Sequence, residues 1–172
     1  SDSKLAKGGI KLKLTKIKIC NYRSFGDEQV IDIDDLTTII GHNSSGKTAA
    51  LCALKTIFSE NSADRSLQRS DFHLPKGKKP EDVDKLDLYI EAVFSFEELL
   101  DDDYESTGAV AIFDHYTVPV ESGIPILRVR MEATWERSSN IEGSIESTIK
   151  YISCPEGEII TEDNSYSAKR SE

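Results

Sequence analysis

The 172-residue chain has no long apolar run and only three cysteines. No stretch of about 18 apolar residues occurs, and no charged start precedes a shorter one, so neither a membrane span nor a secretory signal is indicated. Cys20, Cys52 and Cys154 are odd in number and lack the C-x-x-C or Cys/His spacing of a zinc site. We therefore expect a cytoplasmic protein, unattached to membranes, with reduced thiols.

Positive charge is also scarce, because 31 acidic residues oppose 21 lysines and arginines, for a net charge of −10. Seven of the bases fall in residues 1–23, beside a single acid, so the remainder is strongly acidic. Such a chain lacks a general electrostatic surface for nucleic acid. The lysines near the start alternate with apolar residues, which is typical of a strand with a solvent-facing side. Charge alone therefore predicts no contact with DNA.

The length fits one domain, which can bury roughly 70% of the surface that its unfolded chain exposes. Residues 1–9 show no periodicity and are interpreted as a mobile lead-in or a remnant of cloning. The folded part is expected over residues 10–152. Residues 153–172 are expected to form a polar tail or the start of a linker, uncompacted from residue 155 onward.

Hydrophobic periodicity predicts one helix among many strands. The first strand starts near Ile10 and has a bulge at Thr15 and Lys16, and a second, at residues 29–33, runs antiparallel to it. The other predicted elements are strands at 36–40, 86–96, 109–113, 124–135 and 144–152, a helix at 45–58 that ends near residues 60–61, and a long polar loop at 62–84. The fold class is therefore α/β with α+β character.

Residues 41–48 read Gly-His-Asn-Ser-Ser-Gly-Lys-Thr and match the Walker A pattern G-x-x-x-x-G-K-[ST] at every fixed position. The motif lies between a predicted buried strand and a predicted helix, as the mechanism requires. Glycine allows backbone N–H groups to converge on a β-phosphate, Lys47 reaches the β- and γ-oxygens, and the Thr48 hydroxyl binds Mg²⁺. The predicted ligands are ATP and Mg²⁺, with Lys47 as the catalytic residue and Thr48 as the metal ligand. The predicted nucleotide-binding residues of this loop are Gly41, His42, Asn43, Ser44, Ser45, Gly46, Lys47, Thr48 and Ala49.

Residues 14–25 (LTKIKICNYRSF) and 39–51 (IIGHNSSGKTAAL) together resemble the N-terminus of RecF/SMC-type ABC ATPases. Within that group, residues 68–73 (QRSDFH), followed by the strand at 86–96, resemble the OLD (overcoming lysogenization defect) family of ATP-dependent endonucleases, which includes Gabija-type antiphage nucleases. The resemblance covers residues 12–152. It implies that residues 10–152 are an ABC-type ATPase lobe with a P-loop strand–helix unit and an antiparallel strand meander.

The resemblance further implies that two lobes sandwich ATP, so that the protein forms a homodimer or a higher homo-oligomer. It implies that Asn21 and Arg23 lie near the nucleotide's base, ribose or phosphates, although Arg23 is equally explained as a cation on a surface turn. The complete protein would couple ATP to cleavage of DNA in antiphage defence or DNA repair.

Three parts of the ABC and OLD pattern are missing from the sequence: an LSGG-type signature, a Walker B followed by a catalytic glutamate, and the Toprim acids of the nuclease. We therefore expect the first portion of a longer protein, which by itself scarcely hydrolyses ATP and cuts no DNA.

Two alternatives stay open. One is a self-contained P-loop kinase or NTPase, with residues 109–114 as its Walker B. The other is a non-catalytic nucleotide-sensing dimerisation module. Two strands before the Walker A favour the ABC-type interpretation, because small P-loop kinases usually begin with the Walker A strand.

Other conspicuous residues have ordinary structural interpretations. His42 and His73 could bind phosphate or metal, but single histidines in polar loops usually do neither. Trp135 and Phe96 are expected in the core. The acids at 101–103 are expected to be solvated, because consecutive carboxylates do not share one face of an element.

Overall fold

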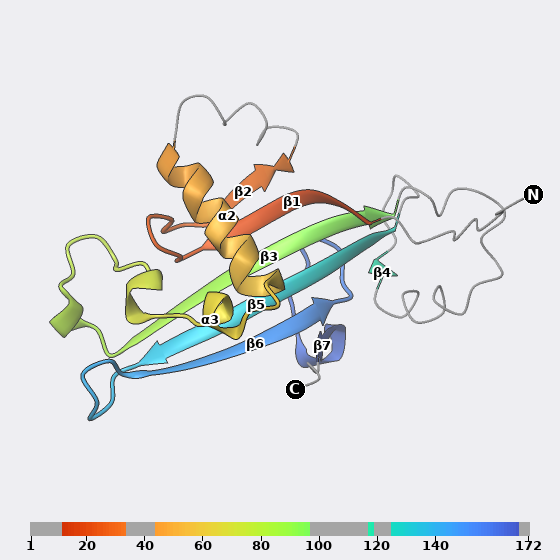
Figure 1. The fold of residues 1–172 in the computed structure, drawn as a ribbon. Coiled ribbons are helices and arrows are strands. Elements are labelled where there is room, and N and C mark those ends of the chain that lie inside the picture. Colours follow the sequence, from red (N-terminus) through yellow and green to blue (C-terminus); the bar gives the residue numbers. More distant parts are fainter. Residues whose placement is uncertain (1–11, 34–43, 97–116, 119–124, 169–172) are drawn as a thin grey trace, which may run out of the picture.

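The computed structural model describes residues 12–33, 44–96, 117–118 and 125–168, and its centre is a single seven-stranded sheet (Figure 1). The strand order is β2-β1-β3-β5-β6-β7, β4 pairs separately with β5, and every recorded pairing is antiparallel. The strands are β1 (Leu12–Cys20), β2 (Gln29–Asp32), β3 (Lys85–Phe96), β4 (Thr117–Val118), β5 (Ile126–Glu136), β6 (Ser144–Ile152) and β7 (Ser165–Ser167). The α+β architecture expected from the sequence is confirmed.

The helical elements are short except for one. They are α2 (Ser44–Phe58), α3 (Ser62–Arg65) and the 3₁₀ turns η1 (Arg69–Asp71), η2 (Pro80–Asp82) and η5 (Glu162–Asn164). The predicted helix is thus confirmed, although it ends at Phe58, and the predicted loop at 62–84 contains α3, η1 and η2. No helix of the described residues is long and apolar enough to cross a membrane.

The first two strands follow the predicted pattern closely. β1 and β2 are antiparallel, with Lys18 opposite Val30. The register of β1 against β3 shifts between Leu14 and Lys16, so the predicted bulge is confirmed at the predicted place. The bulge keeps the apolar side chains of β1 on one face of the sheet on both sides of the irregularity.

The core lies between α2 and the face of the sheet that this helix covers. Ile17, Ile90 and Met131 come from neighbouring strands and are at most 2% exposed. Ala50 and Ala53 of α2 are at most 1% exposed, so small side chains allow the helix to lie close to the strands. Trp135 is buried in the same core, as expected. The side chain of Phe96 lies outside the described residues.

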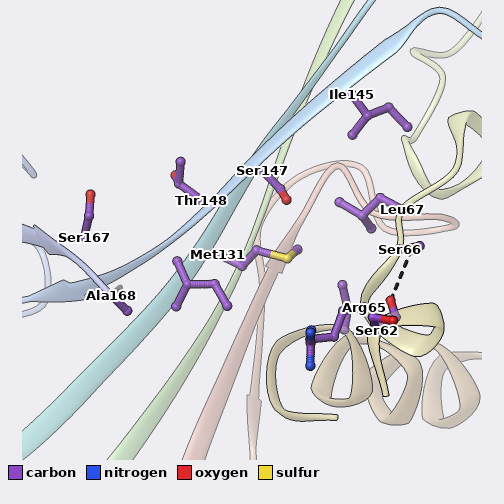
Figure 2. A pocket seen from close by; sticks show the side chains of 12 residues that line it. Ser62, Arg65, Ser66, Leu67, Met131, Ile145, Ser147, Thr148, Ser167 and Ala168 are labelled. Atoms are coloured by element: carbon purple, nitrogen blue, oxygen red, sulfur yellow. Dashed lines mark hydrogen bonds between the residues drawn. The ribbon is translucent and has the colours of Figure 1, made fainter. Parts of the chain in front are cut away.

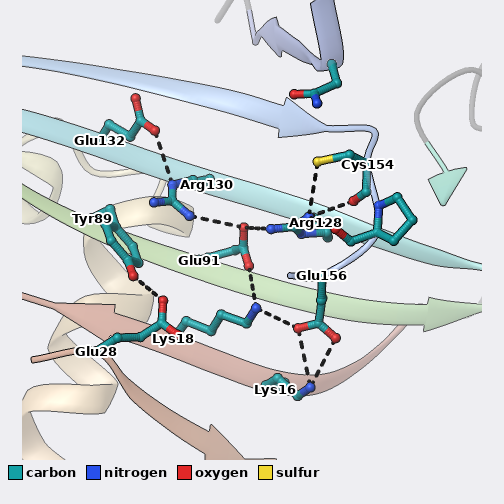
Figure 3. Close-up of polar contacts among 12 residues, drawn as sticks. Lys16, Lys18, Glu28, Tyr89, Glu91, Arg128, Arg130, Glu132, Cys154 and Glu156 are labelled. Atoms are coloured by element: carbon teal, nitrogen blue, oxygen red, sulfur yellow. Dashed lines mark hydrogen bonds and ion pairs between the residues drawn. The ribbon is translucent and has the colours of Figure 1, made fainter. Parts of the chain in front are cut away.

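The opposite face of the sheet is charged and partly covered (Figure 3). Glu91 of β3 is fully buried, and its carboxylate lies 2.9 Å from the guanidinium of Arg128 on β5. Lys18 contacts the same carboxylate at 3.5 Å, and its side chain is only 12% exposed. The expectation that the lysines of β1 simply face solvent is therefore wrong for Lys18, because carboxylates from β3 and from the segment after β6 surround it.

The segment after β6 is packed against the sheet. Ser153 donates its N–H to the Asn164 carbonyl at 2.8 Å, and β7 pairs with the edge of β6. Glu156 contacts Lys16 at 3.1 Å and Lys18 at 2.8 Å. The expectation that the chain is uncompacted from residue 155 is wrong as far as residue 168, because backbone pairing and ion pairs fix a segment that has few apolar side chains. The division at residues 153–172 stays a prediction.

Several predicted features fall outside the described residues. These are the strands at 36–40 and 109–113, the start of the first strand at 10–11, the acids at 101–103, and residues 1–9.

Candidate functional site

The second half of the Walker A motif forms the beginning of α2. The helix starts at Ser44, so Ser45, Gly46, Lys47 and Thr48 lie in its first turn or immediately after it. The first N–H groups of a helix have no partner within the helix, and the helix dipole makes this end attractive to anions. The first turn contains no acidic residue that would oppose an anion. Gly41, His42 and Asn43, and the side chains of residues 44–47, lie outside the described part.

The position of this helix start is set by the packing further along α2. Ala49 is 5% exposed and lies on the buried side, whereas Thr48, one residue earlier, is exposed. At the other end, the rings of Phe58 and Phe94 meet edge to face, with centroids 5.6 Å apart. Because Ala49 is buried near one end of the helix and Phe58 contacts Phe94 of β3 near the other, the packing of α2 sets the direction of its amino end and leaves Thr48 exposed.

The turn after β1 has an unusual backbone. Asn21 and Arg23 have φ angles of 54° and 52°, in the left-handed region that residues other than glycine rarely adopt. Within the turn, Asn21 donates its N–H to the Gly26 carbonyl at 2.8 Å, and Phe25 donates to the Tyr22 carbonyl at 2.9 Å. Such a backbone persists only where the surrounding structure holds it.

The segment Gln68–His73 provides this support, because it pairs directly with the turn. Arg23 donates its N–H to the Asp71 carbonyl at 2.8 Å, and His73 donates its N–H to the Asn21 carbonyl at 2.9 Å. An isolated bridge joins Tyr22 and Phe72 between these two hydrogen bonds. The turn from the segment that resembles RecF/SMC-type ATPases and the segment that resembles the OLD family are therefore neighbours in space, although more than forty residues separate them along the chain.

Arg23 is half exposed and held by an ion pair. Its Nε donates to Asp71 Oδ1 at 3.0 Å, and its guanidinium carbon lies 5.3 Å from the centre of the Tyr22 ring. Burial by itself lowers the pKa of Arg23, but the neighbouring Tyr22 and Asp71 raise it, and the net change is upward. The side chain is therefore a permanent cation. The structure thus places Arg23 on a turn, where Asp71 holds its side chain, and its contact with a nucleotide stays a prediction.

Tyr22 links this turn to α2. Its side chain is 1% exposed, and burial is the main reason that its pKa is raised. The Tyr22 hydroxyl is paired with the side chain of Thr56, and the Thr56 hydroxyl donates to the Cys52 carbonyl at 2.9 Å. The Arg23 turn is therefore fixed against the same helix that carries the Walker A residues.

A polar cavity of about 360 Å³ opens between α2 and the Arg23 turn, and its walls include Tyr22, Arg23, Cys52, Lys55, Ser66 and Asp71. A larger cavity of about 550 Å³ lies between α2, α3 and β6 (Figure 2). In Figure 2, Arg65 and Leu67 line one side and Met131 lines the other. From α2 the larger cavity includes only Thr56, whereas the smaller cavity includes Cys52, Lys55 and Thr56 and also reaches the Arg23 turn. The residues recorded as lining either cavity do not include the first turn of α2, so we take the helix start and the smaller cavity as two separate parts of the candidate site.

The other residues that the sequence singled out as possible ligands have no such place at the candidate site among the described residues. His73 Nδ1 donates to the Arg23 carbonyl at 2.7 Å, so its ring supports the turn. Among the described residues no group of three His, Cys, Asp or Glu side chains could hold a metal ion, and the three cysteines form no disulfide. His42 and the alternative Walker B at 109–114 lie outside the described part. Sequence reasoning noted Asp71 only as a letter of a motif and missed its contact with Arg23.

A Walker A segment that begins a helix packed on an antiparallel sheet defines a P-loop nucleotide-binding lobe. A family model described as "AAA ATPase domain" matches residues 12–171, and the chain therefore belongs to the AAA ATPase domain family. The expected class, an ATP-binding P-loop ATPase lobe, is confirmed by this match. Among curated proteins, no match to the chain was found.

Proposed function

We propose that the chain is the ATP-binding lobe of an OLD-like ABC-type ATPase. In its complete form this protein would couple ATP binding and hydrolysis to endonuclease action on DNA, in antiphage defence or DNA repair. The observation that carries the proposal is the pairing of the Asn21–Arg23 turn with Asp71 and His73, beside the helix that begins with the Walker A residues. This pairing joins the general motif of RecF/SMC-type ATPases to the more particular motif of the OLD family.

In this proposal the phosphates of ATP are held by residues 41–49. Lys47 contributes a charge-assisted contact to the β- and γ-oxygens, and Thr48 contributes a hydroxyl to Mg²⁺. The described features fit this ligand: the helix start has no acid in its first turn, and Thr48 is exposed. When bound, Mg²⁺ supplies positive charge that neutralises the triphosphate.

Asn21 and Arg23 are proposed to contact the base, ribose or phosphates from the side of the cavity. Arg23 provides the only cationic side chain of the turn itself, and its packing on Tyr22 sets its distance from α2. A second copy of the lobe would close over the nucleotide in a homodimer or higher oligomer. DNA would be a partner of the complete protein, which we propose acts in the cytoplasm. Residues 10–152 remain our proposed extent of the lobe.

The nucleotide site is tested by changing Lys47. The variant Lys47→Ala removes a charge-assisted contact worth roughly 1.5–3 kcal/mol, so ATP should bind at least about tenfold more weakly in titration calorimetry with Mg²⁺. Lys85→Ala is the matched control, because Lys85 is an exposed lysine at the start of β3 whose partner is Glu136. Equal affinity of the Lys47→Ala variant and the unchanged chain would refute the site.

The endonuclease part is tested on the product of the full reading frame, if that frame continues beyond Glu172. Plasmid DNA with Mg²⁺ or Mn²⁺ should be cut by that protein in an ATP-dependent manner, and the cutting should be lost in Lys47→Ala. Phosphoryl transfer from ATP to a small molecule, without any action on DNA, would support the P-loop kinase instead.

A further inference from the structure

We propose that Asp71 is a positioning residue that sets the direction of the Arg23 guanidinium at the nucleotide site, and that the segment Gln68–His73 holds the Arg23 turn for this purpose. The inference rests on the proposed function, because Arg23 meets a nucleotide only if that function is correct. It assigns a role to a motif that the sequence marked only as a family resemblance.

The backbone of Arg23 is held in its unusual conformation by the segment Gln68–His73. Arg23 has a φ angle of 52°, a left-handed conformation that an arginine rarely adopts without support from its surroundings. Asp71 and His73 contact both polar backbone groups of Arg23: its N–H donates to the Asp71 carbonyl at 2.8 Å, and its carbonyl accepts from His73 Nδ1 at 2.7 Å. The left-handed conformation is therefore fixed by contacts from another part of the chain.

The Asp71 carboxylate is itself immobilised. Oδ1 accepts from Arg23 Nε at 3.0 Å, and Oδ2 accepts from the Gln68 N–H at 2.8 Å. The Asp71 side chain is only 11% exposed. With both oxygens engaged and little solvent nearby, the carboxylate has one orientation, and water screens the ion pair less than on an open surface.

Asp71 contacts Arg23 at Nε and leaves the two terminal nitrogens without a recorded contact among the described residues. A guanidinium is planar, so a contact at Nε also fixes the directions of the two terminal nitrogens. Those nitrogens can then donate to a phosphate or a ribose without breaking the contact with Asp71. Because the Arg23 side chain is 42% exposed and lines the cavity, the contact orients the cation and leaves it accessible.

A simpler role for Asp71 is to stabilise the fold, and the test must separate the two. A double-mutant cycle does so, because a positioning residue affects ATP affinity only while the residue that it positions is present. The variants are Asp71→Asn, Arg23→Ala and the combination, with Lys47→Ala as the reference for the site. ATP affinity is measured by calorimetry with Mg²⁺, and folding is monitored by circular dichroism.

We expect Arg23→Ala to weaken ATP binding about fivefold to tenfold and Asp71→Asn about threefold, with no further loss on adding Asp71→Asn to Arg23→Ala. Asp82→Asn is the matched control, because Asp82 also accepts a backbone N–H at the start of a 3₁₀ turn, that of Lys79 at 2.9 Å, but has no arginine partner in the described contacts. Its ATP affinity should equal that of the unchanged chain.

Arg23→Lys provides a second measurement that does not alter Asp71. Lysine keeps the charge but lacks the planar Nε contact, so we expect the affinity of Arg23→Lys to fall nearly as far as that of Arg23→Ala. Full ATP affinity in Arg23→Lys would overturn the positioning role. The role would also be overturned if Asp71→Asn weakened ATP binding equally in the unchanged chain and in the Arg23→Ala variant. If Lys47→Ala weakens binding and Arg23→Ala does not, the inference fails while the proposed function stands. If Lys47→Ala has no effect, the proposed function itself fails.

Discussion

At the scale of single residues, the buried Trp135 depends on the backbone of a neighbouring turn. Its Nε1 donates to the Glu142 carbonyl at 2.8 Å, and the guanidinium carbon of Arg69 lies 4.5 Å from the centre of the Trp135 ring. Gly143 follows with a φ angle of 74°, and a Cβ added there would lie 2.4 Å from Trp135 Nε1. The turn between β5 and β6 therefore requires glycine for two reasons, its conformation and its lack of a side chain.

We predict that Gly143→Ala destabilises the protein by about 2–4 kcal/mol, as the sum of left-handed strain and overpacking against Trp135. Gly157→Ala is the matched control, since Gly157 has a φ angle of 90° but nothing within 4 Å of its added Cβ. Gly157→Ala should therefore be destabilised by left-handed strain alone, by on the order of 1 kcal/mol. Urea unfolding, followed by the fluorescence of the single tryptophan, measures the free energy of unfolding of both variants. Equal losses in the two variants would contradict the close approach at Gly143.

Glu91 shows at the same scale what alternation cannot predict. Its place on β3, between the buried Ile90 and Ala92, assigns it to the polar side of a strand, which one expects to face water. The structure buries it completely, because Arg128 and Lys18 reach it from the two neighbouring strands. Alternation in the sequence gives the face on which a side chain lies, whereas burial of that face depends on contacts between residues far apart along the chain.

At the scale of elements, the segment between β6 and β7 is attached to the charged face of the sheet. Arg128 donates from the same terminal nitrogen to the Cys154 carbonyl at 2.6 Å and to the Pro155 carbonyl at 3.2 Å. Glu156 then contacts Lys16 and Lys18 of β1. The segment is thus joined to β5 through its backbone and to β1 through one carboxylate.

This attachment should depend on pH. Burial by itself raises the pKa of Glu156, but hydrogen bonds from Lys18 and Lys16 outweigh it and lower the pKa below the ordinary value of 4.5. A carboxylate with a depressed pKa in the folded state stabilises the protein above its unfolded pKa, and this stability is lost as the pH falls through the folded value. We predict that Glu156→Gln lowers the free energy of unfolding by on the order of 1 kcal/mol at pH 7. At pH 3 the difference should be smaller.

Urea unfolding of both proteins at several pH values measures this effect. Glu158→Gln is the control, because Glu158 is an exposed acid two residues further along the same segment. A difference between Glu156→Gln and the unchanged chain that stays constant from pH 7 to pH 3 would show that the charge of Glu156 is not what holds the segment.

The elements that the sequence predicted are those with a repeating apolar pattern. The period of two in β1, including its bulge, and the helical period of α2 are local properties. The bulge was predicted at its place, and the helix was predicted with its start one residue late and its end two to three residues late. The joining of the Asn21–Arg23 turn to Asp71 and His73 is a contact between distant segments, made largely by backbone groups. Backbone groups are the same in every residue type, so no side-chain pattern predicts which ones pair.

At the scale of the whole molecule, the sheet separates two environments. One face is apolar and holds α2, with the start of the Walker A helix at one end. The other face is held together by ion pairs around Glu91 and Glu156. The helix that begins with the Walker A residues therefore lies on a sheet that is packed on both faces, which suits the proposed binding of a nucleotide. Binding alone, however, does not lower the barrier to hydrolysis.

We predict that the 172-residue chain binds ATP but hydrolyses it at a rate near background. Phosphoryl transfer needs a positioned nucleophile and neutralisation of charge at the transferred group, in addition to a phosphate cradle. The sequence contains no recognisable signature motif or catalytic glutamate after a Walker B, and in the proposed function these parts belong to other portions of the complete protein. Asp114→Asn should accordingly change neither ATP binding nor the residual rate.

The measurement is steady-state release of phosphate, with Lys47→Ala as the control for contaminating ATPases. Turnover near 1 s⁻¹, about the lower end for typical enzymes, that disappears in both Asp114→Asn and Lys47→Ala would mean that Asp114 serves as a true Walker B. Losing its charge would then remove several kcal/mol of transition-state stabilisation, and the chain would be a self-contained P-loop enzyme.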